Sequence, residues 1–234
     1  EAAGCAAPGL PDWHRARAVL RGETDYVPAE LPPYQPQLLP PNERRRATPA
    51  VRQAFRAAED AFRNTSLAPG ACAAVFASSD ADMSIIHRIG LALATPARIV
   101  SPIDFHNTVH NAAAGYWSIA VDARLPSTTV CAYDASFAAG LVEAAALAVV
   151  DGYDTLLVAY DVPVPELLYP KRSIDTAVGV ALLLSPWRRA TANRRLRIHP
   201  PEPAAAATPL ADPALERLRR GNPAARALPL LRQL

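Results

Sequence analysis

The stretch STTVCAYDASFAAGLVEAAALAVVDGYDTLLVAY, residues 127–160, decides the fold class. Its β-branched start, residues 127–132, predicts a strand, and residues 154–160 predict another. The residues between them, 135–152, predict a helix that ends at Gly152. A strand, a helix and a second strand in this order are typical of α/β folds. The sequence therefore predicts an α/β domain with a mostly parallel sheet.

The helix expected over 135–150 carries a single charged residue, Glu143. A helix that is apolar all round is normally buried on every side. We therefore expect another layer to cover it, and the leucine-rich C-terminal tail is the obvious candidate.

Further elements are expected on both sides of this unit. Thr48 is a suitable N-cap and Pro49 a suitable first residue for a helix that runs to about Asn64. The remaining expected helices cover residues 79–94, 107–121 and 212–220, and the remaining strands cover 71–78, 177–185 and 196–200. The strand over 177–185 is expected to run antiparallel to its neighbours. The result is a five-stranded sheet with helices on both faces.

Proline content divides the chain into three segments. Residues 1–48 are Pro-rich and are expected to be irregular, because residues 27–41 alone hold six prolines. Residues 49–200 are expected to form the α/β domain. Residues 201–234 are expected to form a Pro/Leu-rich tail with one short helix.

Composition excludes several classes of protein. The 234 residues carry a formal net charge of +2, too small to indicate nucleic-acid or membrane binding. No apolar run is long enough for a membrane span, and the first residues lack the features of a signal peptide. The three cysteines form no CxxC pair, which indicates a reducing compartment and a cytoplasmic protein.

His106 and His110 stand four residues apart, where an expected helix would place both on one face. Metal sites use such pairs, but no HExxH glutamate lies between them and no third ligand is evident. We expect no metal and no cofactor here, and local hydrogen bonding explains the two histidines.

Other polar residues have ordinary structural explanations. Ser78, Ser79, Asp80 and Asp82 follow a strand where α/β folds often bind ligands, but no Gly-rich fingerprint follows and helix capping accounts for them. Cys131 and Ser136 are candidate nucleophiles outside any GxSxG elbow, and Cys131 is expected to be a small buried residue of its strand. The run Arg44, Arg45 and Arg46 could bind an acidic partner, although a solvated loop is the commoner explanation.

A longer stretch, residues 99–161, resembles the N-terminal half of the β-ketoacyl-acyl-carrier-protein synthases. The matching signals are Val100-Ser101-Pro102, the segment Asn111 to Gly115, and Pro126-Ser127 before the strand. They occur in the family's order within a resemblance that covers about residues 45–186. It is most similar to the short ketosynthase-like chain-length factors of aryl polyene and xanthomonadin-type pigment clusters. The resemblance implies half of a thiolase-like fold.

Two departures from the family pattern bear on activity. The family's nucleophilic cysteine falls at Asp134, and a carboxylate cannot carry an acyl chain as a thioester. The family's two catalytic histidine motifs do not appear, since only His199 follows Trp187. The resemblance therefore implies a non-catalytic subunit that pairs with an active β-ketoacyl-ACP synthase, with acyl carrier protein as a further candidate partner.

The resemblance also implies two contact regions. The strand of Ser127, Thr128, Thr129, Val130, Cys131 and Ala132 would pair with the partner's strand across the dimer axis. A preceding segment would line the partner's acyl tunnel with Ile103, Phe105, His106, Asn107 and His110. Phe105 is the bulkiest of these, and its alternative place is this chain's own core.

Two other functions stay open at this point. The chain could be a decarboxylase or hydrolase that acts on carrier-bound acyl groups through Asp134. It could instead be a docking module that binds acyl carrier protein with its arginine-rich surface.

Overall fold

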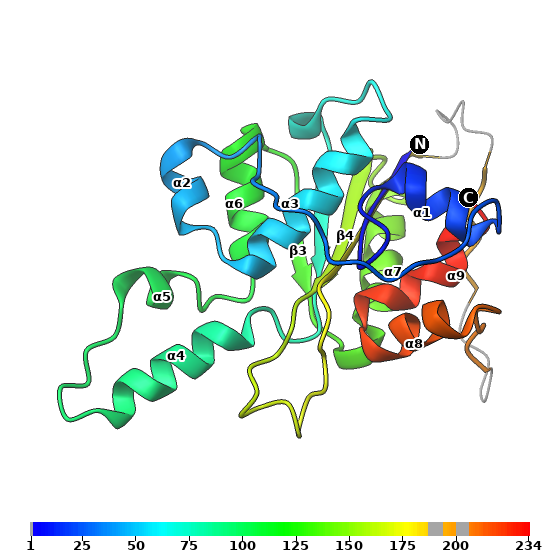
Figure 1. Ribbon diagram of the computed structural model, residues 1–234. Helices are drawn as coiled ribbons and strands as arrows, with labels where there is room; N and C mark the ends of the chain where they lie inside the picture. The colour runs from blue at the N-terminus through cyan, green and yellow to red at the C-terminus, as the bar shows by residue number, and fades with distance from the viewer. Residues whose placement is uncertain (1, 187–193, 200–205) are drawn as a thin grey trace.

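The computed structural model describes residues 2–186, 194–199 and 206–234, and it contains one five-stranded sheet (Figure 1). The strand order is β1-β5-β4-β2-β3. β2 pairs parallel with β3 and β4, whereas β5 pairs antiparallel with β4 and β1. The strands are β1 (Ala2–Ala6), β2 (Ala73–Ala77), β3 (Ser127–Val130), β4 (Thr155–Asp161) and β5 (Val178–Leu184).

The α/β class and the five strands are confirmed, and the sheet is mixed: β1, β2, β3 and β4 run in one direction and β5 runs against them. The antiparallel direction of β5 is as expected. The fifth strand is β1 and not residues 196–200: residues 196–199 form no strand, and residue 200 lies outside the described residues. The sequence AAGCA of β1 has little strand propensity, and its pairing with β5 sets its conformation.

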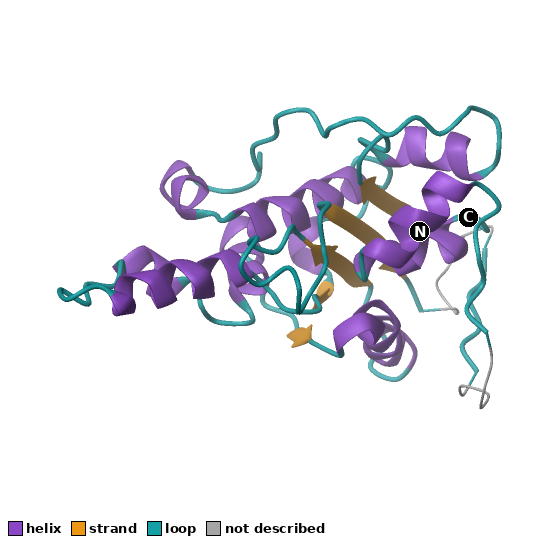
Figure 2. Cartoon of the chain, turned by 60° about the horizontal axis from the view of Figure 1, so that its bottom comes forward, coloured by secondary structure: helices purple, strands orange, loops and turns teal. Residues whose placement is uncertain are grey.

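Helices cover both faces of the sheet (Figure 2). One face packs against α3 and α6, and the other packs against α1, α7 and the C-terminal helices. The α-helices are α1 (Trp13–Leu20), α2 (Pro41–Arg46), α3 (Pro49–Phe62), α4 (Met83–Ala94), α5 (Pro102–His106), α6 (Ala112–Val121), α7 (Ser136–Val149), α8 (Pro213–Gly221) and α9 (Leu228–Leu231). The 3₁₀ helices are η1 (Pro69–Ala71), η2 (Tyr133–Ala135) and η3 (Ala224–Ala227). None of the described helices is both long and apolar enough to cross a bilayer.

Residues 1–48 are irregular only in part, since residues 21–40, which hold most of their prolines, form no helix or strand. The same N-terminal segment contains β1, α1 and α2, and buried polar groups of α3 hold the first two elements in place. The Asp60 carboxylate accepts hydrogen bonds from the backbone N–H of Cys5 (3.0 Å) and of Trp13 (2.6 Å). The Gln53 side-chain amide donates to the Ala6 carbonyl at 2.7 Å. These long-range contacts are invisible to local sequence patterns.

α4 and α5 project from the body of the molecule, and we call residues 83–106 the arm (Figure 1). The expected helix start at residue 79 predicts a cap at Ser79 or Asp80, but Asp82 caps α4 by accepting from the Ser84 N–H at 3.1 Å. An ion pair of 2.7 Å between Arg88 and Asp104 joins the two helices.

The apolar residues of α4 do not face a core. Ile85 is buried, but Ile86 and Leu93 are about half exposed and Ile89 is only partly buried. The spacing of these four apolar residues in the sequence predicts that all of them face inward, and that prediction is wrong. The apolar period is present, but the described part of the chain supplies no layer for the outer residues to pack against.

α7 is buried on one side only. Gly140 lets it approach the sheet, since a Cβ there would lie 2.8 Å from the Ala77 Cβ and 3.0 Å from the Leu157 Cδ1. On the outer side Val142 and Val149 are exposed. The C-terminal segment, residues 210–234, packs beside α7 on the same face of the sheet and does not cover that outer side.

Candidate functional site

Chemically active side chains gather where β2, β3 and β4 end. All three strands are parallel, so their carboxyl ends lie at one edge of the sheet, the usual place for ligand sites in α/β folds. The turn Tyr133–Ala135 connects β3 to α7 there, and it contains Asp134. Ser78 and Ser79 follow β2, and Asp161 ends β4.

Two arginines from distant segments bind the Asp134 carboxylate. Arg172 donates to its Oδ1 at 2.6 Å, and Arg226 of η3 donates to its Oδ2 at 2.7 Å. Arg172 also pairs with Asp80 at 3.4 Å, and its guanidinium lies 3.9 Å from the centre of the Tyr133 ring. Both oxygens of Asp134 therefore serve in ion pairs.

Asp161 is a second buried carboxylate, and four groups donate to it. Oδ1 accepts from the Ser78 hydroxyl (3.1 Å), the Ser79 N–H (2.8 Å) and the Ser79 hydroxyl (2.7 Å). Oδ2 accepts from the Ala224 N–H at 3.1 Å. Burial raises the pKa of Asp161 to about 6, against the opposing effect of these hydrogen bonds.

The C-terminal segment is fastened to the same edge of the sheet. Besides the contacts of Ala224 and Arg226, the buried Asn222 amide donates to the Thr176 carbonyl at 2.8 Å and to the Asp161 carbonyl at 3.4 Å. Sequence reasoning missed Arg172, Arg226 and Asn222, because nothing in their local sequence links them to Asp134 or Asp161. Asp161 had a detectable signal: it directly follows the strand predicted over residues 154–160.

The two candidate nucleophiles have structural partners. The Ser136 hydroxyl is buried and donates to the Tyr133 carbonyl (2.7 Å), with the Ser78 carbonyl as a second acceptor in reach (3.2 Å), while accepting from the Ala132 N–H (3.0 Å). The Cys131 thiol donates to the Ser79 carbonyl at 3.0 Å. Cys131 lies beyond the last residue of β3 and is exposed, so its expected burial within a strand is wrong.

β3 is one of the two edge strands of the described sheet, and β1 is the other. The Ala74 N–H donates to the Pro126 carbonyl, and the Ser78 N–H donates to the Val130 carbonyl. Because partners alternate along a parallel strand, Thr128 also faces β2, whereas the peptide groups of Ser127 and Thr129 face away from the sheet. The strand is shorter than predicted, since Cys131 and Ala132 do not belong to it.

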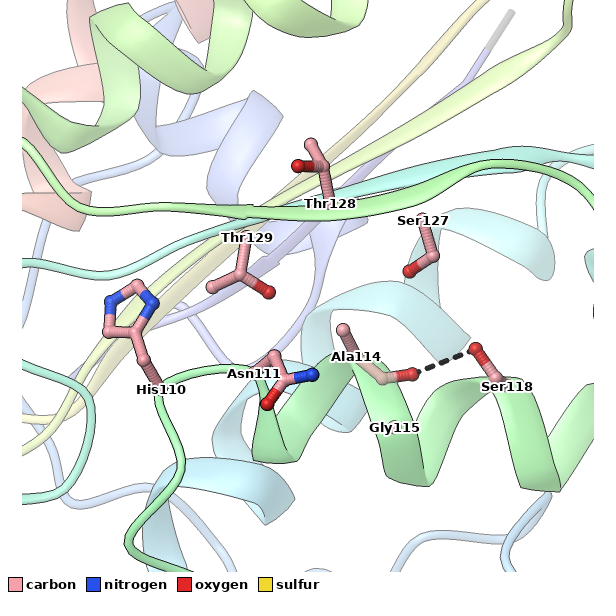
Figure 3. A pocket seen from close by; sticks show the side chains of 8 residues that line it. All are labelled: His110, Asn111, Ala114, Gly115, Ser118, Ser127, Thr128 and Thr129. Atoms are coloured by element: carbon pink, nitrogen blue, oxygen red, sulfur yellow. Dashed lines mark hydrogen bonds between the residues drawn. The ribbon is translucent and has the colours of Figure 1, made fainter.

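An open groove of about 460 Å³ lies between α6 and β3 (Figure 3). The His110 Nε2 and the Thr129 Oγ1 are buried beside it and have no hydrogen-bond partner in the described part of the chain. Small and polar side chains line the groove: His110, Asn111, Ala114, Gly115, Ser118, Ser127, Thr128 and Thr129.

The residues expected to line a partner's tunnel differ in their exposure to solvent. Ile103 and Phe105, on α5, are exposed, with 70% of Phe105 accessible. Asn107 is buried, and its amide donates to the Ile103 carbonyl at 2.9 Å. His106 ends α5 with its ring edge-on to Tyr116, at 6.2 Å between ring centres.

His106 and His110 do not share a helix face. The helix predicted over 107–121 begins only at Ala112, so His110 lies in the turn before α6. Among the described residues no group of three His, Cys, Asp or Glu side chains could hold a metal ion.

The arginines of α2 mainly contact their own surroundings. Arg44 donates to the Leu39 carbonyl at 2.9 Å, Arg45 donates to the Asn42 side chain, and Arg46 pairs with Glu43 at 3.4 Å. They form a short helix rather than the expected loop.

The sequence and this fold agree with a known domain. The model of the β-ketoacyl synthase N-terminal domain matches residues 13–222. The chain belongs to this family. Asp134 therefore lies between a strand and a helix of a ketosynthase domain, at the turn where the resemblance places the nucleophile. No curated protein sequence gives a significant match.

Solved ketosynthase structures share the fold. The ketosynthase ApeO in complex with its chain length factor ApeC, from Xenorhabdus doucetiae, matches at 25% identity and a TM-score of 0.66, covering 79% of this chain and 77% of the matched one. The ishigamide ketosynthase/chain length factor matches at 15% identity and a TM-score of 0.64, covering 81% and 62%. A complex of a type II polyketide acyl-carrier protein with its ketosynthase, AntDE:AntF, also has 15% identity and a TM-score of 0.64, covering 80% and 62%. The chain thus spans less than two thirds of the length of the latter two.

Proposed function

We propose that this chain is a non-catalytic, chain-length-factor-like subunit that pairs with an active β-ketoacyl-ACP synthase and shapes its acyl tunnel. The pathway is fatty acid or polyketide-type synthesis of an aryl polyene-like pigment. The proposal includes a cytoplasmic location, which fits three cysteines that are all free.

The state of Asp134 carries the proposal. A ketosynthase needs a thiolate at this turn to hold the acyl chain, and a carboxylate cannot do so. Each oxygen of Asp134 is bound by a different arginine, at 2.6 and 2.7 Å. This carboxylate is a structural ligand for two guanidinium groups, which supports a role without condensing chemistry.

Two exposed features support an obligate partner. The outward peptide groups of Ser127 and Thr129 leave an open sheet edge, which proteins usually cover or pair. The arm presents Leu91, Leu93 and Phe105 to solvent. Such apolar area is typical of surfaces that bind another protein. The solved complex of ApeO with its chain length factor is a precedent for a ketosynthase as that partner.

The exposure of Phe105 supports its proposed place in the partner's tunnel. A ring with 70% of its surface accessible is not part of this chain's own core, the alternative considered from sequence. Ile103 on the same short helix is also exposed. α5 can therefore present apolar side chains to a neighbouring subunit, whereas the buried Asn107 holds the end of the helix.

The other two functions receive less support. A hydrolase or decarboxylase would need an Asp134 oxygen free to act on substrate, and both are engaged by arginine. A docking role for the α2 arginines conflicts with their contacts to Leu39, Asn42 and Glu43.

The decisive experiment is purification of the tagged chain, followed by mass analysis of what accompanies it. We expect a ketosynthase in one-to-one ratio, with the pair condensing acyl and malonyl units on carrier protein. The chain alone should accept no acyl group, which intact-protein mass spectrometry measures. Acyl loading or carbon–carbon bond formation by the purified chain would contradict the proposal.

A further inference from the structure

Tyr133 combines three properties that do not usually occur together. Its backbone φ is +52°, in the left-handed region that aromatic residues rarely adopt. Its side chain is 60% exposed. It belongs to the turn that follows the open edge strand β3. A costly backbone conformation that keeps a large ring in solvent indicates a functional constraint rather than a packing one.

The surrounding charges hold this ring in place. The Arg172 guanidinium stacks on it at 3.9 Å, and Arg172 is in turn fixed by ion pairs with Asp80 and Asp134. Asp134 is tied to Arg226 of the C-terminal segment. The ring is therefore supported on one face by a network whose four charged residues come from four separate segments of the chain.

The network is also balanced in charge. Two arginines meet two aspartates, and each of the four groups has an oppositely charged partner. A surface of this kind can be covered by another protein without leaving an unpaired charge, which would be costly. The balanced charges of the network and the fixed position of the ring together make the exposed face of Tyr133 suited to burial against another protein.

We propose that Tyr133 is an anchor residue of the interface with the ketosynthase subunit, and that Asp134 is the positioning residue that holds it ready. This inference rests on the proposed function and assigns a role to the residue at the nucleophile position. Its occupant is the active ketosynthase, because Tyr133 lies three residues beyond the end of β3, the strand proposed to pair with that subunit, and the exposed Cys131 lies between them. Tyrosine is enriched among residues that dominate binding energy, and a ring ordered in advance loses little freedom on binding.

The test measures the dissociation constant of the purified chain for its co-purified ketosynthase, together with thermal midpoints of the chain. Tyr133→Ala should raise Kd about thirtyfold, the change that corresponds to about 2 kcal/mol for an anchor residue. Tyr133→Phe keeps the ring and should bind within about threefold of the wild type. Tyr133→Gly should bind as poorly as the alanine variant but melt at least as high as the wild type, because glycine relieves the left-handed strain.

Asp134→Asn separates positioning from general destabilisation. It should raise Kd about tenfold in the wild-type background and have little effect in the Tyr133→Ala background. The reason is that both substitutions remove the same contact, that of the Tyr133 ring with the partner, so their effects do not add. An equal effect in both backgrounds would overturn the positioning role. Binding of both Tyr133→Ala and Tyr133→Gly within threefold of the wild type would overturn the anchor.

The wild-type measurement tests the proposed function separately. If the wild-type chain binds no ketosynthase, the pairing itself is wrong and the inference falls with it. If the chain instead forms homodimers that Tyr133→Ala disrupts, the anchor serves a second copy and the ketosynthase is overturned as the occupant. If the pair forms and only the Tyr133 variants bind normally, the function stands and the inference alone fails.

Discussion

Replacing Thr129 by proline tests whether β3 is the pairing edge. The Thr129 peptide group faces away from the sheet, because Pro126, Thr128 and Val130 take the bonds to β2. Proline at 129 therefore removes a donor that the chain itself does not use. If a partner strand pairs there, one of its carbonyls loses its donor inside a buried interface, at a cost of about 1–3 kcal/mol. The dissociation constant should rise roughly 5- to 150-fold.

Thr128→Pro is the matched control, since the Thr128 N–H faces β2. This variant should weaken the fold itself by about 1–3 kcal/mol, which lowers the thermal midpoint by about 2–4 °C for each kcal/mol in a chain of this size. Thr129→Pro should leave the thermal midpoint of the chain close to that of the wild type. Calorimetry gives the midpoints, and titration with the ketosynthase gives Kd. A Thr129→Pro variant that binds normally would show that β3 is not the interface.

Three further predictions concern the rest of the site. Phe105→Ala should lengthen the products of the reconstituted pair by about one elongation cycle without abolishing synthesis, because the phenylalanine ring imposes overpacking of about 1–3 kcal/mol on a longer acyl chain. Unchanged product lengths with the complex intact would show that Phe105 does not line the tunnel. Asp134→Cys should not give the chain condensing activity, because arginines rather than a general base contact this position, and acyl loading followed by condensation would refute this. Asp161 has a folded-state pKa raised from 3.8 to about 6, so its stabilising contribution is fully present only below pH 3.8 and is lost as the pH rises through 6. Relative to Asp161→Asn, the wild type should lose about 2 kcal/mol of unfolding free energy between pH 4 and 7 in urea titrations, and parallel curves would contradict the burial argument.

Elements that local sequence specifies were predicted well. Thr48 caps α3 by accepting from the Val51 N–H, and β2, β4 and β5 coincide with apolar runs. Local patterns failed where a distant contact decides. β1 is a strand because β5 pairs with it, and the outer side of α7 is exposed although its sequence suggests full burial.

The candidate site shows the same division. The position of Asp134 after β3 followed from the order of short motifs, and its place in a turn before α7 agrees with that prediction. Its partners could not be predicted, because Arg172 and Arg226 reach it from segments 38 and 92 residues away. The exposure of Phe105 could not be predicted either, since an aromatic residue in a short helix suits a core as well as an interface.

The pairing of β1 with β5 has a consequence for the order of assembly. Ala2 lies beside Leu183, and the sheet joins β1 to the other strands only through β5. During synthesis β1 thus has no strand to pair with until nearly the whole sheet has been made, and contacts between such distant residues form slowly. The Asp60 carboxylate on α3, which binds the Cys5 and Trp13 N–H groups, is available much earlier. α3 can therefore bind the N-terminal residues through Asp60 before β5 is available to pair with β1. Loss of the Asp60 carboxylate should then slow folding and favour aggregation of the nascent chain.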